Sequence, residues 1–431
     1  MIFQKRIDNT WEITQRIRSW CLRNSGDIVV LDSCQIPSVE NLGDWEILVG
    51  ANLQVEQWSA DSIDQKVDLH RLLNEGAGWR FFALSYDLKN QLENLSSNNP
   101  DSMSFPDLAV FTPGIVIGVK KTGEVYIQAP NTKELWNQIQ SESFDQQTNP
   151  NTQIEGDEHC SMTESTYMSR VNTIREEIEN GNVYEMNLCM EYIFNEATIH
   201  RPYQLFSELT QLSPTPFAAY IQWGSRFVIS ASPERFLYKT GDMLYSQPIK
   251  GTSKRHADTH KDQRAFQYLK ESEKERAEHV MIVDLVRNDL SRCCIPGTVR
   301  VEDLFGVYSY AQVHQMISTV RGQLMKDVTI ADIVQHTFPM GSMTGAPKVS
   351  AMTFIEELEE HQRGWYSGTI GYIDPDGNMD SNVVIRSILY DAGLKRLSYS
   401  VGGAITYDSV AQNEFEECQL KASAIRSILH R

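Results

Sequence analysis

Short apolar runs separated by turn residues recur along the chain, and they restrict its possible folds more than any other feature. In the first third of the chain they lie at residues 27–33, 45–50, 80–88 and 114–130. Short apolar runs bounded by turn formers are typical of strands. The last run predicts a hairpin that turns near Lys121-Thr122-Gly123.

Similar runs continue further along, at residues 187–195, 217–223, 226–232, 368–373, 382–390 and 396–406. Helices are predicted at 262–290 and at 408–430, and in the second of these the apolar residues follow an a/d-like spacing. The strands are grouped and do not alternate one by one with helices. The sequence therefore predicts an α+β fold with the strands segregated into sheets.

A third predicted helix has signals at both ends. Ser161-Met-Thr-Glu164 has the pattern of a capping box at the start of the helix, and Gly181 is a signal for its C-terminal end. Between them apolar residues recur at helical spacing, at Met168, Val171, Ile174 and Ile178. Since the stretch before this helix is polar and rich in turn formers, we predict three parts. They are a β-rich N-terminal subdomain (1–130), a polar linker (131–162) and a larger C-terminal domain (163–431).

Composition describes an ordinary globular protein and excludes several classes of function. The 431 residues are 41% hydrophobic and 22% charged, and the formal net charge of −18 does not predict nucleic-acid binding. No apolar run approaches the roughly 20 residues of a membrane span, and no secretory signal is visible at the start. The seven cysteines are scattered without a C-x-x-C pair, so neither zinc nor disulfides are indicated. We expect a cytoplasmic protein without membrane or nucleic-acid partners.

Two predicted helices each carry a pair of glutamates three residues apart. Glu275 and Glu278 share one helix face, as do Glu414 and Glu417. Mg²⁺ prefers hard oxygen ligands and is usually held by one or two carboxylates. The alternative is an acidic surface exposed to water, with Glu417 and Lys421 as an i,i+4 ion pair. Spacing alone favours the surface.

Two glycine-containing segments are candidate anion-binding loops. In residues 338–348 the spacing does not match a nucleotide-binding P-loop, because Ala346 and Pro347 separate the second glycine from the lysine. Backbone N–H groups in such loops can still bind a carboxylate, and residues 401–406 offer a second example.

Four further residues carry alternative interpretations. Glu234, directly after a proline, could be a buried general acid or part of a salt bridge. Arg386 interrupts an apolar strand and needs an anionic partner, either internal or on a substrate. His314 lies among apolar residues, where a satisfied core histidine is the more common outcome. Lys250, between Pro-Ile and Gly-Thr, could be a loop charge or a nucleophile, and local sequence favours the loop charge.

Eight segments in order resemble the chorismate-utilising enzymes, which include anthranilate, aminodeoxychorismate, isochorismate and salicylate synthases. They are YEMNLC (184–189), ASPERF (231–236), PIKGT (248–252), AEHVMIVDLVRNDL (277–290), FPMGSMTGAPK (338–348), WYSGTIGYI (365–373), MDSNVVIRS (379–387) and NEFEECQLKA (413–422). Eight collinear segments are far more specific than one motif. The resemblance implies two β-sheets packed face to face, with helices outside and an active site between them.

The resemblance also implies a set of site residues. Mg²⁺ would be held by Glu278 and Glu417, with Glu275 and Glu414 acting through water, and Glu234 would be the general acid for the departing 4-hydroxyl. The implied substrate contacts are Arg386 and Tyr366 with backbone N–H groups near Gly402 and Gly403 for the enolpyruvyl carboxylate, Thr344, Gly251 and Thr252 for the ring carboxylate, and His314 beside the ring.

Within the family, the resemblance implies that few positions decide the product. Isochorismate and salicylate synthases carry a lysine base where this chain has Glu185, so addition of water is disfavoured. Ammonia-using members usually have glutamine there. Lys250 resembles the aminodeoxychorismate synthases, in which this amine attacks C2 of chorismate and ammonia then attacks C4 and expels the lysine. A neutral amine is needed, and we expect a lowered pKa for Lys250 beside Mg²⁺.

The expected function is that of aminodeoxychorismate synthase component I, which serves 4-aminobenzoate and folate synthesis. Ammonia would come from a separate glutamine amidotransferase subunit, because no cysteine lies in a Gly-x-Cys-x-Gly setting. One alternative is anthranilate synthase component I, in which PIAGT usually replaces PIKGT. Another is a non-catalytic sensor of chorismate or tryptophan, since residues 30–33 and 214–217 fall near places where relatives hold tryptophan.

Overall fold

Hydrogen bonding connects twenty strands into one antiparallel ladder that folds back on itself. The computed structural model describes residues 1–24, 26–60, 66–143, 152–155 and 157–429, and the strand count refers to these residues. A separate two-stranded sheet joins β7 (Thr152–Glu155) to β10 (Glu196–Ile199).

The ladder has two branches that meet at a pair of long strands, β3 (Trp45–Trp58) and β5 (Leu108–Lys120). The first branch runs from β3 through β2 (Ile28–Asp32), β11 (Phe217–Trp223), β12 (Arg226–Ser232), β21 (Ser387–Asp391) and β22 (Arg396–Ile405) to β9 (Glu185–Phe194), which also pairs with β8 (His159–Cys160) and β18 (Gly345–Ala346). The second branch runs from β5 through β4 (Arg80–Leu84), β19 (Thr369–Ile373), β20 (Met379–Asn382), β13 (Arg235–Thr240) and β14 (Met243–Gln247) to β17 (Val313–Gln323), which also pairs with β15 (Ile249–Lys254) and β16 (Arg300–Ser309). Residues 116–119 of β5 pair with β6 (Glu124–Gln128), and β6 pairs in turn with β1 (Ile2–Arg6).

A shared apolar core shows that the two branches face each other. Val29, Ala219 and Val228 of the first branch belong to the same buried cluster as Phe81 and Ile370 of the second. Burying the inner faces of both layers in this way is how a sheet sandwich excludes water from its apolar residues. The predicted α+β class with two face-to-face layers is confirmed, and the layers are joined through β3 and β5 as one ladder.

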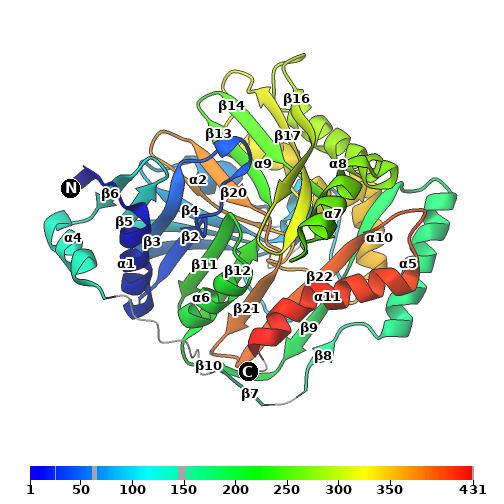
Figure 1. Ribbon diagram of the computed structural model, residues 1–431, viewed down its shortest axis with the longest axis horizontal. Helices are drawn as coiled ribbons and strands as arrows, with labels where there is room; N and C mark the ends of the chain where they lie inside the picture. The colour runs from blue at the N-terminus through cyan, green and yellow to red at the C-terminus, as the bar shows by residue number, and fades with distance from the viewer. Residues whose placement is uncertain (25, 61–65, 144–151, 156, 430–431) are drawn as a thin grey trace.

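Helices cover the outer faces of both layers (Figure 1). The first layer packs against α1 (Thr10–Arg23), α4 (Thr132–Ser141), α5 (Glu164–Glu179), α6 (Pro202–Leu212), α10 (Lys348–Leu358) and α11 (Ala411–Leu429). The second packs against α2 (Leu69–Asn74), α8 (Glu273–Ser291) and α9 (Ile330–Thr337), while α7 (Thr259–Glu271) contacts β15, β16 and β17. Short helical turns complete the fold: η1 (Val39–Asn41), η2 (Tyr86–Leu88), α3 (Lys89–Leu92) and η3 (Gly341–Met343).

The predicted helices are present, with corrected ends. The helix expected at 262–290 is two helices, because Ser272 ends α7 and caps α8 through a hydrogen bond from the backbone N–H of Glu275. The N-cap of α5 is Thr163, so the capping box expected from Ser161 is wrong by two residues. The hairpin of β5 and β6 is confirmed, and Gly123 in its turn has a positive φ of 86°.

The predicted linker of 131–162 is only partly irregular, since α4, β7 and β8 occupy described parts of it. Residues 144–151 and 156 of that linker lie outside the described residues. Strands of the two flanking parts pair directly, β2 with β11 and β4 with β19. The boundaries 1–130, 131–162 and 163–431 remain predictions.

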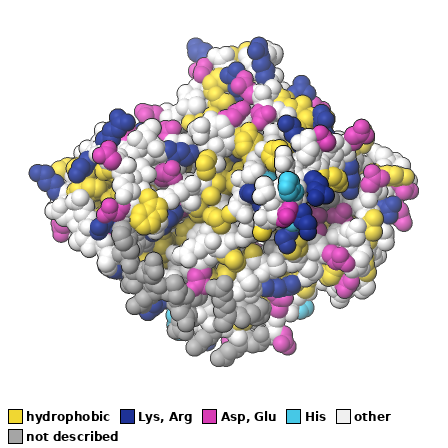
Figure 2. All heavy atoms as spheres, viewed as in Figure 1, with side chains coloured by type: hydrophobic (Ala, Val, Ile, Leu, Met, Phe, Trp, Pro, Cys, Tyr) yellow, Lys and Arg dark blue, Asp and Glu magenta, His cyan; other side chains and the backbone are white. Residues whose placement is uncertain are grey.

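Acidic and basic side chains are interspersed over the face shown in Figure 2, so negative charge is not concentrated in one region of that face. Among the described residues, no helix combines the length and apolar character needed to cross a membrane.

Candidate functional site

Lys250 lies on β15 with its ammonium facing two carboxylates. Its Nζ is 2.9 Å from Oε1 of Glu185 on β9 and 3.7 Å from Oε2 of Glu278 on α8. The side chain is 16% exposed, and Glu185 is 1% exposed. The structure therefore brings the candidate nucleophile, a candidate metal ligand and Glu185 together from three separate elements.

These carboxylates change the expected charge of Lys250. Burial by itself would lower the pKa of its ammonium, but the negative charges of Glu185 and Glu278 outweigh burial and raise the pKa. This direction reflects the protein groups alone, and the lowered pKa of Lys250 expected beside Mg²⁺ stays a prediction. Lys250 is held protonated, so a proton must leave Nζ before the nitrogen can attack.

A glycine allows the close approach of β15 to α8. Gly251 has a positive φ of 92°, and a Cβ there would lie 2.9 Å from Oε2 of Glu275 and 3.1 Å from Cδ1 of Leu269. The pairing of β15 with β17 is irregular between Ile249 and Thr252. Lys250, for which a loop charge was one alternative, therefore lies at an irregular position within a strand, with its side chain toward Glu185 and Glu278.

His279 on α8 fixes the backbone of Lys250. Burial lowers the pKa of its imidazole to about 4, so the ring is neutral near pH 7. Nδ1 donates to the carbonyl of Lys250 at 3.1 Å, because a carbonyl only accepts. Nε2 must then accept from the hydroxyl of Ser318 at 2.7 Å.

Glu234 lies between β12 and β13 and is 5% exposed. Burial raises the pKa of its carboxyl to about 7, although hydrogen bonds from the side chain of Ser342 and the backbone of Ile249 act in the opposite direction. A cavity of about 10 Å³, room for about one water, adjoins both Glu234 and Ser342. Glu234 can thus carry a proton near neutral pH, and its bond from Ile249 places it beside the segment that bears Lys250.

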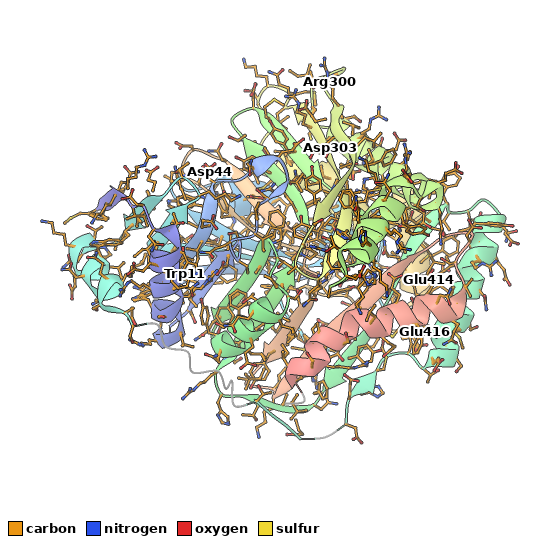
Figure 3. The ribbon with its side chains drawn as sticks, viewed as in Figure 1. Trp11, Asp44, Arg300, Asp303, Glu414 and Glu416 are labelled. Carbon is orange, nitrogen blue, oxygen red and sulfur yellow. The ribbon has the colours of Figure 1, made fainter. Side chains whose placement is uncertain are left out.

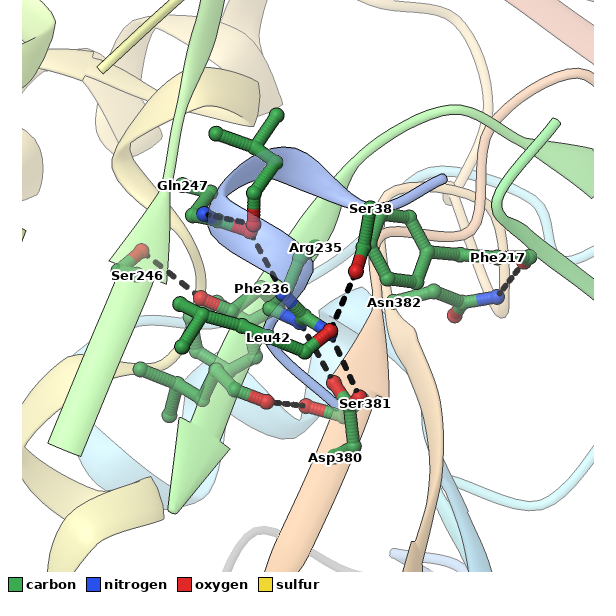
Figure 4. A network of polar contacts seen from close by, with 12 residues as sticks. Ser38, Leu42, Phe217, Arg235, Phe236, Ser246, Gln247, Asp380, Ser381 and Asn382 are labelled. Carbon is green, nitrogen blue, oxygen red and sulfur yellow. Dashed lines mark hydrogen bonds and ion pairs between the residues drawn. The ribbon is translucent and has the colours of Figure 1, made fainter. Parts of the chain in front are cut away.

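Arg235 anchors the strand that begins next to Glu234 (Figure 4). Its guanidinium bonds both carboxylate oxygens of Asp380, at 2.8 and 2.9 Å, and also Oε1 of Gln247 at 2.6 Å. It donates as well to the carbonyl of Leu42 at 3.0 Å. A planar, bidentate network of this kind fixes orientation, so the neighbouring Glu234 has little freedom to leave the site.

The four helix glutamates are gathered around Lys250. Thr406 donates to Glu278 at 3.4 Å, while Lys421 forms a 2.7 Å ion pair with Glu417. Burial raises the pKa of both Glu275 and Glu414, with further contributions from Glu278 and Glu417 respectively.

The oxygen atoms of these four carboxylates are ligands that a hard divalent cation prefers, and a bound cation would reduce the repulsion between the carboxylates. In the described ranges, no group of three His, Cys, Asp or Glu side chains already converges as a ligand cluster. The carboxylates of Glu278 and Glu417 each face a lysine side chain. Both carboxylates would have to reorient in order to bind one shared ion.

The two-glycine segment lies against β9. Gly402 and Gly403 on β22 are opposite Cys189 and Leu188 on β9. A Cβ on Gly402 would be only 2.4 Å from Sγ of Cys189, so this close approach requires glycine. A Cβ on Gly403 would lie 3.5 Å from Oε2 of Glu414, which places the segment beside the acidic cluster.

A buried ion pair supports β9 from the other side. Arg363 donates to Glu359 and is 1% exposed, as is Glu359. Arg363 also donates to the carbonyls of Met343 and Asn187, and Glu359 accepts from the backbone N–H of Cys189. This pair therefore ties β9 to the loop at 338–348.

Tyr366 and Arg386 lie on segments whose backbones are bonded to each other. Ser367 donates to the carbonyl of Val384 at 2.9 Å, and Val384 donates to that of Gly368 at 2.8 Å. Arg386 has a positive φ of 53°, and burial lowers the pKa of its guanidinium. No ion pair or side-chain hydrogen bond of Arg386 occurs among the described residues, so its guanidinium is available for an anion.

Thr344 is buried in the loop beside β9, where its carbonyl accepts from the backbone N–H of Asn187 at 2.8 Å. Its hydroxyl is bonded to the carbonyls of Met340 and Gly341. Thr252 is exposed on β15, opposite Gln315.

The structure does not bring His314 together with these residues. His314 is opposite Ser253, whose hydroxyl is bonded to α7, and its ring contacts Ser309, Asp262 and Phe266. Adjacent residues of a strand point to opposite faces, so Gln315 shares the face of Thr252 instead. Gln315 is 3% exposed, and its Oε1 lacks a hydrogen-bond partner among the described residues.

Sequence reasoning missed four residues of this region: Gln315, His279, Ser342 and Thr406. His279 and Ser342 lie within matching segments, and they could have been found there as polar residues next to motif positions. For Gln315 and Thr406 the sequence contains no comparable signal.

A second cavity, of about 60 Å³, lies away from Lys250. Asp32, Ser33, Phe217 and Asp380 are among the residues that line it. Residues 30–33 and 214–217 therefore meet at this cavity, although tryptophan binding there stays a prediction.

The fold and the site together define a two-layer α+β protein with a partly buried lysine, a protonatable glutamate and an acidic cluster. Residues 40–427 match the family model described as chorismate binding enzyme, and the chain belongs to that family. It is a chorismate-utilising enzyme by this membership and by its relatives.

Three relatives show how the similarity is distributed. Aminodeoxychorismate synthase component 1 of Escherichia coli is 32% identical over 88% of this chain and 83% of its own length. Anthranilate synthase component 1 of Thermus thermophilus is 33% identical over 79% and 75%. Aminodeoxychorismate synthase of Streptomyces griseus is 41% identical over 61% of this chain, which spans only 36% of that relative.

Solved structures support the fold. Anthranilate synthase component I of Streptococcus pneumoniae superposes with a TM-score of 0.73 at 24% identity, covering 93% of this chain and 92% of that one. The menaquinone-specific isochorismate synthase of Escherichia coli gives 0.74 at 15% identity, covering 100% and 94%.

Proposed function

We propose that this chain is an aminodeoxychorismate synthase component I, which converts chorismate and ammonia to 4-amino-4-deoxychorismate for 4-aminobenzoate and folate synthesis. The observation that carries the proposal is the position of Lys250, paired with Glu185 and Glu278 and adjacent to the residue that bonds Glu234. The similarity to aminodeoxychorismate synthases of Escherichia coli and Streptomyces griseus supports it.

In this proposal Lys250 and Glu234 perform complementary steps. Nζ of Lys250 forms a bond to C2 of chorismate, the ring double bonds shift, and the C4–O bond breaks. Glu234 gives its proton to the departing hydroxyl, which leaves as water. A carboxyl whose pKa is about 7 is well suited to this role near neutral pH.

The remaining residues bind and orient the substrate. Arg386 and Tyr366 would hold the enolpyruvyl carboxylate near Gly402 and Gly403, and Thr344, Gly251 and Thr252 would line the ring carboxylate. Mg²⁺ would be held by Glu278 and Glu417, with Glu275 and Glu414 behind them, and it would neutralise the ring carboxylate. Ammonia would be supplied by a glutamine amidotransferase subunit.

Intact-mass analysis tests the covalent step. Wild-type protein mixed with chorismate and Mg²⁺ without ammonia is expected to form an adduct on Lys250, and Lys250→Ala is expected to form none. Identical adducts in both proteins would reject Lys250 as the nucleophile.

The product distinguishes this proposal from anthranilate synthase component I, which the Thermus relative favours. With ammonium present, we expect 4-amino-4-deoxychorismate and no anthranilate fluorescence. Anthranilate formed without an added lyase would support the alternative. Protein that consumes no chorismate at saturating ammonium would instead support a non-catalytic sensor.

A further inference from the structure

The sheet is irregular on both sides of β17. On one side, β15 leaves its register with β17 directly after Ile249, and on the other side β16 resumes its register at Gly306 after a shift. Ile317 is opposite both of these residues, whereas the next residue, Ser318, has no ladder partner among the described residues. Irregularities of this kind release backbone groups from the ladder, and the released groups need other partners.

The side chains of Ser318 and His279 join two of the released backbone groups. On the β16 side, the backbone N–H of Phe305 donates to Oγ of Ser318 at 3.1 Å. Oγ of Ser318 is 2.7 Å from Nε2 of His279, and Nδ1 of the same ring is 3.1 Å from the carbonyl of Lys250 on β15. Ser318 and His279 are both 0% exposed, so water does not compete for these bonds.

The two ends of this chain fix the direction of every bond in it. A backbone N–H only donates and a carbonyl only accepts, so Nδ1 carries a hydrogen and donates it to Lys250. Within the described residues, Nε2 of His279 is the only acceptor for the hydroxyl hydrogen of Ser318. One tautomer of His279 therefore satisfies all of these groups, and successive bonds of the same direction strengthen one another.

Phe305 holds its end of the chain in a costly conformation. Its φ is 64°, which is unfavourable for a residue other than glycine and persists only where the surroundings fix it. The ring of Phe305 packs between two residues of α8: its centroid is 5.8 Å from that of His279 and 4.5 Å from the guanidinium of Arg276. This packing keeps the N–H of Phe305 directed at Ser318.

The peptide group between Lys250 and Gly251 depends on the other end. Gly251 has a positive φ of 92°, and a glycine lets the peptide group before it rotate at little cost. The irregular pairing of β15 does not prevent that rotation. The bond from His279 does, because rotation would turn the carbonyl of Lys250 away from Nδ1.

We propose that Ser318 is a positioning residue for Lys250 and acts through the ring of His279. Its hydroxyl keeps the ring in one orientation, and the ring holds the carbonyl of Lys250. The ammonium then stays directed at Glu185 and Glu278. Ser318 touches no substrate in this role. The inference rests on the proposed function, because Lys250 is the proposed nucleophile.

Ser318→Ala provides the test, since it leaves the ring of His279 free to turn. Adduct formation with chorismate and Mg²⁺ is followed by intact mass. It is expected to slow roughly tenfold, as for one lost neutral hydrogen bond, with the half-saturating chorismate concentration unchanged. Acetylation of Lys250 by acetic anhydride, read by peptide mass, needs no substrate. It is expected to become up to about tenfold faster, because Nζ leaves its carboxylate partners more often.

His279→Asn separates this route from others. The amide N–H of asparagine takes the place of Nδ1–H and needs no partner at the position of Nε2. Ser318→Ala added to His279→Asn is therefore expected to change neither rate further. Ser398→Ala is the matched control, because Ser398 is 1% exposed and its hydroxyl donates to the buried Glu191 on β9. Both rates in Ser398→Ala are expected to equal those of wild type.

Each result decides the matter. Unchanged acetylation in Ser318→Ala, equal effects with and without His279, or the same changes in Ser398→Ala overturn the positioning role. A change in the half-saturating chorismate concentration alone also overturns it. If wild type forms no adduct while acetylation responds to Ser318→Ala only in the presence of His279, the proposed function fails and the positioning role stands.

Discussion

The side chain of Glu234 accepts a hydrogen bond from the backbone of Ile249, the residue directly before Lys250. Strand β15 therefore couples the position of the candidate general acid to that of the candidate nucleophile. This hydrogen bond links Glu234, between β12 and β13, to the strand that carries Lys250, so the roles of the two residues can be tested together.

The first test is the pH dependence of adduct formation. Burial raises the pKa of Glu234 to about 7, and a general acid acts only while protonated. Because Nζ of Lys250 must also lose its proton, the single-turnover rate should rise with pH up to about 7 and then level off, where loss of the Glu234 proton offsets the growing share of neutral amine. Glu234→Gln should lower the rate and remove this levelling, so that its rate keeps rising above pH 7. A plateau that persists in Glu234→Gln would assign the titration to another group.

The second test concerns the close approach at Gly251. Gly251→Ala combines a strained positive φ with a Cβ placed 2.9 Å from Glu275, so both stability and adduct formation should fall. Gly241→Ala is the control, because Gly241 has a positive φ of 56° but no atom within 4 Å of the position that a Cβ would occupy. The control should lose about 1–2 kcal/mol in urea unfolding with its adduct rate preserved. Equal adduct rates in the two variants would contradict a positioning role for Gly251.

The third test addresses metal binding without relying on activity. Mn²⁺ can replace Mg²⁺, and free Mn²⁺ is measured directly by electron paramagnetic resonance. Glu414→Gln should weaken binding roughly 10–100-fold, as is usual for an outer partner of a metal ligand, and Glu278→Gln should weaken it further.

Glu416→Gln is the control for that experiment, because Glu414 and the exposed Glu416 lie on opposite sides of α11 (Figure 3). It should leave the affinity for Mn²⁺ unchanged. Equal weakening by Glu414→Gln and Glu416→Gln would point to a diffuse charge effect and against a defined site.

The fourth test measures the buried pair beneath β9. Arg363→Met leaves Glu359 buried without its partner and should lower the free energy of unfolding by about 3–5 kcal/mol. Arg287→Met breaks an exposed pair with Asp284 and should cost less than about 1 kcal/mol. Urea denaturation followed by circular dichroism compares the two. A small loss in Arg363→Met would show that the pair contributes orientation and not stability.

Much of the fold could be predicted because the strands are apolar on their buried faces and bounded by turns. The grouping of β2, β3 and β5 in the first third of the chain follows from that pattern. The pairing of β2 with β11 could not be predicted, since it joins residues about 190 positions apart and leaves no local signal.

Glu234 and Lys250 could be singled out as site candidates because each lies in a segment that resembles the family, and their roles stay predictions. His314 and Gln315 show the limit. Two adjacent polar residues on a strand point to opposite faces, and only the register with β15 tells which one shares the face of Thr252. The direction of the Lys250 pKa shift likewise depends on Glu185, which is 65 positions away in the chain.

The ladder that joins the two layers has a consequence for shortened forms of this protein. β2 and β4 each pair with a strand of the second half, so removing residues 1–130 would leave β11 and β19 each without one neighbour. Unpaired strand edges recruit other strands, and such edges are normally protected in native proteins. A version starting at residue 163 would keep every proposed catalytic residue and yet be prone to self-association, so the N-terminal part acts as an edge protector for the catalytic half.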